Sequence, residues 1–251
     1  MTFEITEPIL VIGLGRVGAE LAEKAKKSLN SDSLLISHDQ KDLTGENSIK
    51  ISTKSVVNPS IHLIRGSTLE NLEEIQEKVS KYSTIILMSN LAGKAGIGIA
   101  PIVSKICKEQ EKNLLSFAIM PFKFEKDRIF QSGIALKRIR HDSHCTIVLD
   151  NDALLDSNPD LSHEQCNHIS NKAIESVISS LKLSEISEDV NILSTSKDAD
   201  DMEVSLKDSL RMLYEDAPPN SIKRSMLYVY GGSNVPIGVL NSISNITGGV
   251  F

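Results

Sequence analysis

The stretch SNLAGKAGIGIAP, residues 89–101, constrains the fold of this chain more than any other. The apolar segment 84–88 precedes it and reads as a buried strand, and apolar residues at helical spacing follow it. A glycine-rich turn from a strand into a helix gathers free backbone N–H groups and the positive end of the helix dipole at one point. Gly93, Gly96 and Gly98 let the backbone approach a phosphate closely. The stretch therefore predicts an anion site.

A second glycine motif, GLGRVG over residues 13–18, follows the apolar segment 9–13, which reads as another buried strand. A helix is expected after the motif, then a strand over 33–37 and the acidic Asp39. A strand, G-x-G-x-x-G and an acidic residue about 20 positions later form the dinucleotide-binding fingerprint. One interpretation of the chain is therefore a Rossmann-type NAD(P)-binding enzyme. The glycines of the motif are Gly13, Gly15 and Gly18.

The composition argues against several classes of protein. The chain has 251 residues, a formal net charge of −6 and a pI near 5.6, with no basic stripe in its sequence, which disfavours a nucleic-acid partner. Its three cysteines are sparse and odd in number, as in proteins of a reducing cytosol. The polar, acidic N-terminus is unlike a signal peptide, and no apolar run reaches the ~18 residues of a membrane span. We therefore expect a cytoplasmic protein without a transmembrane segment.

Around both glycine motifs the chain resembles the FtsZ/tubulin superfamily. FtsZ carries Gly-Gly-Gly-Thr-Gly-Thr-Gly and then Ala-Ala-Pro, and this chain has AGKAGIG over 92–98 and then IAP. The end of the second strand, ISHDQKDL over 36–43, is similar to Ile-Asn-Thr-Asp-Ala-Gln-Asp-Leu in FtsZ. An NAD(P)-binding enzyme has no reason for this continuation. The resemblance implies that both glycine loops bind the phosphates of a guanine nucleotide.

Two further segments resemble the nucleoside-binding parts of the superfamily. PFKFE over 121–125 matches Pro-Phe-x-Phe-Glu of FtsZ, which implies that Glu125 and Arg128 lie near the ribose and base. NDALL, beginning at Asn151, resembles the loop whose Asn reads the purine edge, because an amide offers a donor and an acceptor side by side. Without the resemblance, the two phenylalanines would be read as core residues and the glutamate as a solvated helix start.

A helix over about 162–181 resembles the central helix that joins the two domains of this superfamily. Asn171 falls where tubulin has its second guanine-reading Asn. Asn167 falls one turn earlier, where tubulin and FtsZ have a stacking aromatic residue. The resemblance thus implies base recognition by Asn151 and Asn171, with the aromatic stacking lost.

The alternation of strands and helices predicts a doubly wound α/β fold with a mostly parallel sheet and the ligand at the carboxyl ends of the strands. We expect a GTPase-like nucleotide-binding domain over residues 1–182, including the central helix, and an abbreviated second α/β domain over 183–251. In the second domain the sequence predicts a helix over 201–215, a strand over 225–230 and a helix over 235–246.

The signature loop departs from the family where phosphoryl transfer depends on positioned donors. Both threonines of the FtsZ loop are replaced, by Ala95 and Ile97. Lys94 either restores positive charge beside the phosphates or points into solvent. Arg16 is either a phosphate contact or an exposed residue at a helix start. Of the loop that positions the attacking water in FtsZ, Asp189 and the valine after it survive, so Asp189 is the candidate catalytic residue.

These departures predict a divergent FtsZ-like cytoskeletal or scaffold protein. It would bind GTP or GDP, with Mg²⁺ as the accompanying ion, weakly or not at all, and hydrolyse GTP slowly if at all. Two alternatives stay open: an active, polymerising FtsZ-type GTPase and the Rossmann-type NAD(P)-binding enzyme. Protein partners and a homo-oligomer or filament are expected. The candidate nucleotide-binding residues are Gly13, Gly15, Arg16, Gly18, Asp39, Gly93, Lys94, Gly96, Gly98, Glu125, Arg128, Asn151, Asn167 and Asn171.

Histidine and cysteine occur together in two places, over 141–145 and 163–168, with loosely zinc-like spacing. The first group enters a predicted strand, and the second opens the helix that follows the far end of that strand. About six residues of strand would separate the groups by ~20 Å. The sequence therefore predicts no metal site.

Overall fold

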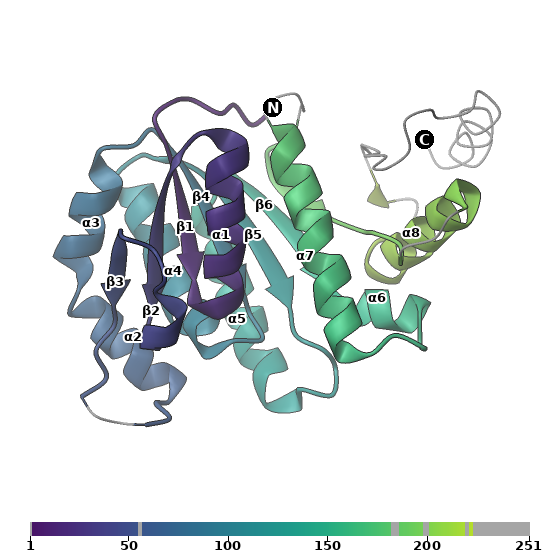
Figure 1. The fold of residues 1–251 in the computed structure, drawn as a ribbon, viewed down its shortest axis with the longest axis horizontal. Helices are drawn as coiled ribbons and strands as arrows, with labels where there is room; N and C mark the ends of the chain where they lie inside the picture. Colours follow the sequence, from purple (N-terminus) through teal and green to yellow (C-terminus); the bar gives the residue numbers. More distant parts are fainter. Residues whose placement is uncertain (1, 55–56, 182–185, 198–200, 219–220, 223–251) are drawn as a thin grey trace.

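The computed structural model is built around one seven-stranded parallel sheet with helices on both faces (Figure 1). Parallel strands covered on both faces are apolar along nearly their whole length, and every residue of β1 (Ile9–Leu14) is buried. Two hydrophobic cores result, one on each side of the sheet. The structure describes residues 2–54, 57–181, 186–197, 201–218 and 221–222.

The strand order is β3-β2-β1-β4-β5-β6-β7, and each neighbouring pair is parallel. The order reverses between β1 and β4, where Gly13 pairs with Met88. In a doubly wound sheet the ligand crevice opens at such a reversal, outside the carboxyl ends of the strands. The other strands are β2 (Asp32–Ser37), β3 (Ser48–Lys50), β4 (Thr84–Asn90), β5 (Asn113–Met120), β6 (Cys145–Asp150) and β7 (Asp189–Ile192).

The helices divide between the two faces. α1 and α7 pack against each other on one face, and α2, α3, α4 and α5 cover the other (Figure 1). None of the described helices is long and apolar enough to cross a lipid bilayer. The helices are α1 (Gly15–Leu29), the 3₁₀ turn η1 (Gln40–Asp42), α2 (Ile61–Leu69), α3 (Leu72–Ser80), α4 (Lys94–Glu109), α5 (Lys126–Asp142), α6 (Asn151–Ser157), α7 (His163–Ser180) and α8 (Met202–Asp216).

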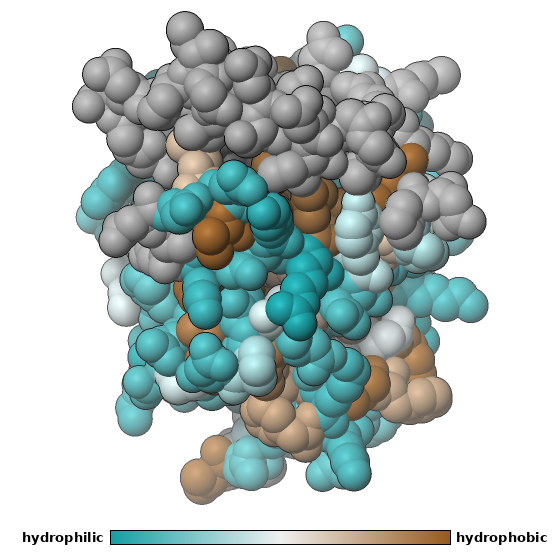
Figure 2. Space-filling model, turned by 90° about the vertical axis from the view of Figure 1, so that its right-hand side faces the viewer, coloured by the Kyte–Doolittle hydropathy of each residue, from teal (hydrophilic) through white to brown (hydrophobic). Residues whose placement is uncertain are grey.

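The side of the molecule that carries α8 is mainly polar. Figure 2 faces this side and shows hydrophilic side chains over most of its described surface, with hydrophobic ones in small separate groups. α8 packs on α6 through one face, where Met212 is fully buried, while Val204 on α8 is 45% exposed. The apolar surface of α8 is thus largely used within the molecule.

The predicted doubly wound α/β fold is confirmed, and so are the predicted central helix, as α7, and the helix over 201–215, as α8. One detail was wrong: α4 begins at Lys94, so much of the glycine-rich stretch is helix rather than loop. β7, after residue 182, pairs with β6 and extends the main sheet.

The division into two domains stays a prediction. The expected strand over 225–230 and helix over 235–246 lie outside the described residues.

Candidate functional site

Two helix N-termini meet at the point where the strand order reverses. α1 follows β1 directly, with Leu14 as its N-cap, and α4 follows β4 with Gly93 as its N-cap. Neither cap makes a side-chain hydrogen bond, and neither first turn contains an acidic residue. The first backbone N–H groups of a helix have no partner within the helix. This edge of the sheet therefore presents two sets of unpaired donors and two positive dipole ends.

The two glycine loops lie in contact with each other. Gly15 has a φ of +64°, a conformation that glycine adopts without strain. A Cβ at Gly15 would lie 2.9 Å from the Cβ of Ala95 and 4.0 Å from Asp42 Oδ2. The sequence prediction that the two glycine motifs share one site is thus consistent with their placement.

Several of the glycines are also required by packing within the protein. A Cβ at Gly13 would lie 2.4 Å from the Gly18 carbonyl oxygen, and one at Gly18 would lie 2.5 Å from that of Met88. A Cβ at Gly96 would lie 2.1 Å from the carbonyl oxygen of Asn90. A Cβ at Gly98 would lie 3.0 Å from Ile64 Cγ2, and one at Gly93 would lie 3.3 Å from the Asn90 carbonyl oxygen, so both contacts are milder. Close backbone packing explains Gly13, Gly18 and Gly96 without any ligand.

Lys94 does not point freely into solvent. Its Nζ donates hydrogen bonds to Asn58 Oδ1 at 2.5 Å and to the carbonyl oxygen of Pro59 at 2.8 Å. The cation therefore lies at the start of α4 and is fixed by the loop before α2. It adds a full positive charge beside the helix dipole, where an anion would be stabilised.

His38 is a site residue that the sequence reasoning missed. It follows β2, and its Nδ1 is buried without a hydrogen-bond partner. Burial lowers the pKa of His38. The carboxylates of Asp42 and Asp39 act against this shift, and the cation of Lys94 adds to it. A polar residue directly after a buried strand of a parallel sheet was the available signal. Asp39 itself is exposed and accepts a hydrogen bond from the Lys41 N–H at 3.0 Å.

Arg16 is the most exposed of the predicted phosphate contacts. Its side chain is 83% exposed, and its Nε lies 3.3 Å from Glu20 Oε1, one helical turn away. Such a surface pair is weak. The position fits the interpretation of an exposed residue at a helix start.

Glu125 and Arg128 link the start of α5 to the glycine loop of β4. Glu125 Oε2 accepts a hydrogen bond from the Phe122 N–H at 3.2 Å. Arg128 Nη1 lies 4.0 Å from Glu125 Oε1 and donates a hydrogen bond to the carbonyl oxygen of Ala92. A cavity of about 210 Å³ is lined by residues 124–128. The two predicted residues are thus brought together beside the glycine loop that follows β4.

An exposed aromatic face lies next to these residues. Phe122 is buried, but Phe124 is 63% exposed and stacks on it with ring centroids 5.1 Å apart. The His163 ring lies 4.9 Å from Phe122. Asn167 Nδ2 lies 3.2 Å from His163 Nδ1, so the predicted base-binding helix borders this face. The alternative interpretation, made without the family resemblance, of both phenylalanines as core residues is wrong for Phe124.

Asn151 is held by the central helix. It is 1% exposed, and its Oδ1 accepts a hydrogen bond from Ser170 Oγ at 2.6 Å. Asn171 follows Ser170 on α7 and is half-buried. One of the two acceptor positions of the Asn151 amide oxygen is therefore used within the protein.

Asp189 lies at the opposite edge of the sheet from the glycine loops. It begins β7, pairs with Cys145 at the amino end of β6, and its N–H donates to the His144 carbonyl oxygen at 2.8 Å. Its side chain is exposed, and its φ is +83°. Asp189 therefore cannot act on a nucleotide bound in the site of its own chain.

Carboxylates gather at the carboxyl end of β6. Burial, and then the neighbouring Asp150, raise the pKa of Asp216 to about 7. Burial likewise raises the pKa of Asp150. Lys123 Nζ pairs with Asp152 at 2.7 Å and with Asp156 at 2.5 Å. Among the described residues, no group of three or more histidine, cysteine, aspartate or glutamate side chains has the geometry of a metal site.

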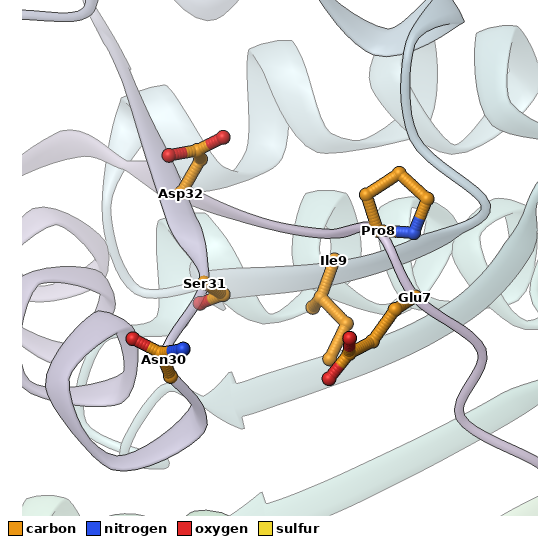
Figure 3. Close-up of a pocket in the computed structure, with 6 residues that line it drawn as sticks. All are labelled: Glu7, Pro8, Ile9, Asn30, Ser31 and Asp32. Atoms are coloured by element: carbon orange, nitrogen blue, oxygen red, sulfur yellow. The ribbon is translucent and has the colours of Figure 1, made fainter.

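Another cavity lies at the other edge of the sheet. It has a volume of about 460 Å³ and is lined by residues 7–9 at the start of β1 and 30–32 in the turn from α1 to β2 (Figure 3). Glu7 and Asp32 are among its lining residues. Two carboxylates disfavour an anion there, so we place the site at the glycine loops instead.

Comparisons with known proteins find similarity to one family. Residues 64–159 match the family model "Tubulin/FtsZ family, GTPase domain". "Cell division protein FtsZ 2" of Halobacterium salinarum is 34% identical over 87 residues, which cover 35% of this chain and 22% of the relative. Over these residues the chain is similar to the FtsZ/tubulin superfamily. "Cell division protein FtsZ 1" of the same organism is 25% identical over 166 residues, 61% of this chain and 41% of the relative.

Solved structures of the superfamily share the fold of this FtsZ-like chain. An FtsZ dimer from M. jannaschii superposes with a TM-score of 0.62 at 19% identity, covering 71% of this chain and 55% of that one. TubZ of Clostridium botulinum phage c-st gives 0.55 at 18% identity, covering 81% and 74%. The chain spans 41% or less of the two halobacterial relatives, so the activity of a whole FtsZ is not transferred by these matches.

Proposed function

We propose that this protein is a divergent FtsZ-like cytoskeletal component that binds GTP or GDP weakly and hydrolyses GTP little or not at all. The observation that carries the proposal is the meeting of two uncapped helix N-termini, at Gly15 and Ala95, with the cation of Lys94 beside them. This arrangement stabilises a chain of phosphates through backbone donors and helix dipoles. It needs no hydroxyl side chain to do so.

The nucleotide would lie along the carboxyl edge from β1 to β6. Its phosphates would bind the loops over 13–18 and 93–98. Its ribose would lie near Glu125 and Arg128, and its base near Asn171 and the NH₂ group of Asn151. The exposed ring of Phe124 offers the base an aromatic face, which supplies part of the stacking that was expected to be lost at Asn167.

Magnesium fits the same place through Asp42. Its Oδ2 lies close to Gly15 and accepts a hydrogen bond from Ser37 Oγ at 2.6 Å. A carboxylate beside the phosphate loops opposes an anion unless a cation lies between them, and Mg²⁺ binds through one or two carboxylates together with phosphates. Asp42, with the exposed Asp39, would hold the ion, which when bound would neutralise phosphate charge.

Slow or absent hydrolysis follows from the side chains at the start of α4. Ala95 and Ile97 are both buried and carry no donor. Preorganised donors usually supply the largest part of the stabilisation of a phosphoryl-transfer transition state. Asp189 lies on the far edge of the sheet, so it would act only on a nucleotide in a second copy of the chain. The proposal therefore includes a homo-oligomer or filament, working in the cytoplasm in a scaffold or cell-division role with protein partners.

Calorimetric titration tests the proposal. GTP, GDP, ATP and NAD would each be titrated, with magnesium, into the wild type, K94A and the control K26A, whose lysine lies in the last turn of α1. We expect guanine-selective binding that K94A weakens about tenfold and K26A leaves unchanged. Selective NAD binding would support the Rossmann-type enzyme instead. Tight GTP binding with rapid turnover would support an active GTPase.

A further inference from the structure

We infer that the outer face of α5 is a docking surface for an anionic lipid membrane. This surface consists of Phe130 and Ile134, which lie one helical turn apart, together with the cations that flank them. Phe130 is 76% exposed and Ile134 is 37% exposed. Exposed apolar side chains that lie together, with polar residues around them, often mark an interaction site. The proposal does not depend on nucleotide binding.

The helix that bears these side chains is held firmly by its inner face. Ser132, Ala135 and Ile139 are buried. Ser132 Oγ donates hydrogen bonds to the carbonyl oxygens of Leu91 and Arg128, at 2.6 and 2.7 Å. Phe130 and Ile134 lie on the opposite side of the helix, and neither is needed to fix it. The outer face is thus a rigid ridge available to a partner.

Charge indicates the kind of partner. α5 contains five basic and two acidic residues, although the whole chain has a net charge of −6. One of the two acids, Asp142, is already paired with Lys108 at 3.3 Å. Four exposed cations of α5 form no ion pair with any residue that the structure describes: Lys126, Lys137, Arg138 and Arg140. A strongly basic helix in an acidic protein is complementary to an anionic surface.

Arg65, on the neighbouring helix α2, adds positive charge beside the ridge. Arg65 on α2 has its Nε buried without a hydrogen-bond partner. Burial, and then the nearby Arg138 guanidinium, lower the pKa of Arg65. Two guanidinium groups that repel each other in the free protein are both stabilised when phosphate groups come between them. This pair extends the basic surface from α5 to α2.

The shape of the surface favours lipid over an acidic protein or nucleic acid. Lys126 and Lys137 lie near the two ends of the ridge, with Phe130 and Ile134 between them on the same helical face. A Cβ at Gly133, on that face, would meet nothing within 4 Å. The surface is therefore a convex ridge with an apolar centre, not a groove. Interfacial helices with basic flanks insert their apolar side chains below lipid headgroups in this way.

The experiment is co-sedimentation of the full chain with vesicles of phosphatidylglycerol and phosphatidylcholine, beside vesicles of phosphatidylcholine alone. We expect binding to the anionic vesicles only, and loss of binding at high salt, because salt screens exposed charges. K137Q/R138Q should weaken binding about tenfold. The control K26Q/K27Q removes the same charge from α1, on the other face of the sheet, and should change little.

The apolar part is tested by F130S, which should weaken vesicle binding about tenfold without lowering the melting temperature, since Phe130 is mostly exposed. Equal losses in K137Q/R138Q and K26Q/K27Q would overturn the proposal, as would equal binding to neutral vesicles. Two further outcomes would replace it. One is binding to a DNA duplex but not to vesicles. The other is self-association that F130S abolishes, with no vesicle binding.

Discussion

At the scale of single residues, Gly96 shows that a glycine of the signature loop can be required by packing within the protein, whether or not a ligand binds. A Cβ at this position would lie 2.1 Å from the carbonyl oxygen of Asn90, which is backbone and cannot move aside. We expect G96A to destabilise the protein by about 2–4 kcal/mol, as overpacking against a rigid neighbour does. Thermal or denaturant unfolding measures the change.

Gly133 is the matched control for Gly96. It also lies inside a helix, but a Cβ there would meet nothing within 4 Å. G133A should therefore stabilise the protein by about 0.5–1 kcal/mol, because alanine loses less backbone entropy in a helix than glycine. If both variants unfolded at the same denaturant concentration, close packing would not be the reason for Gly96.

His38 leads to a prediction about pH. Burial holds its pKa below 6.5 in the folded protein, so the unfolded chain binds the proton more readily. The contribution of His38 to stability is therefore present above pH 6.5 and falls as the pH drops below that value. H38Q, which cannot take up a proton, should lose less stability than the wild type between pH 7 and 5. Parallel unfolding curves for the two proteins across this range would contradict the prediction.

The residue scale is also where the sequence was least informative. Gly15 and Ala95 are 80 positions apart, and their contact depends on the pairing of β1 with β4. The hydrogen bond from Ser170 to Asn151 likewise joins two elements that no local pattern connects. His38 was missed because a single polar residue after a strand is also common in loops. Motif glycines, by contrast, were found because their spacing is local.

At the scale of secondary-structure elements, periodicity and apolar runs located nearly all of the strands and the central helix. α2 (Ile61–Leu69) was missed because its sequence, IHLIRGSTL, has only a weak amphipathic pattern. The start of α4 was placed too late because glycine argues against helix by propensity. Tertiary packing overrides that propensity here: Gly96 and Gly98 let α4 lie against Asn90 and against Ile64 of α2.

The docking of α8 leads to a prediction at the same scale. Burial, and then Asp150, raise the pKa of Asp216 to about 7, far above its ordinary 3.8. The folded protein therefore binds the proton more readily than the unfolded chain, and stability is lost as the pH rises from about 4 through 7. D216N should stabilise the protein at pH 8 by about 1 kcal/mol, allowing for solvent screening of a partly exposed group, and change little at pH 4.

Hydrogen exchange across α8 is the measurement for D216N, since a local effect appears there first. The control is D208N, on the same helix, because burial, Asp150 and Glu215 raise the pKa of Asp216 and Asp208 is not among the causes. Slower exchange in D216N than in the wild type at pH 8, and equal exchange at pH 4, is the expected result. A gain of the same size at both pH values would show that the carboxyl pair is not the cause.

At the scale of the whole molecule, strand order decides where the ligand lies, and the sequence could predict it only through the family resemblance. The order β3-β2-β1-β4-β5-β6 belongs equally to a dinucleotide-binding fold. Composition and periodicity alone therefore could not separate the two functions. What separated them were short segments such as residues 36–43 and 121–125, whose residue types a dinucleotide site does not require.

The position of Asp189 leads to the last prediction. The nucleotide loops follow the carboxyl ends of the strands, whereas Asp189 pairs with Cys145 at the amino end of β6. On the proposed function, in which Asp189 is the catalytic residue, GTP turnover would combine the site of one copy with Asp189 of another. The rate per molecule should be low and should rise with protein concentration. D189N should abolish it, because asparagine tolerates the positive φ of this position but carries no charge.

Mixing two variants distinguishes this arrangement from catalysis within one chain. D189N keeps an intact nucleotide site, and K94A keeps an intact Asp189. Each alone should be inactive or nearly so, while a mixture should recover part of the wild-type rate, since a K94A copy can present Asp189 to the site of a D189N copy. A rate per molecule that is independent of concentration, or a mixture no more active than its components, would mean that the residual chemistry occurs within a single chain.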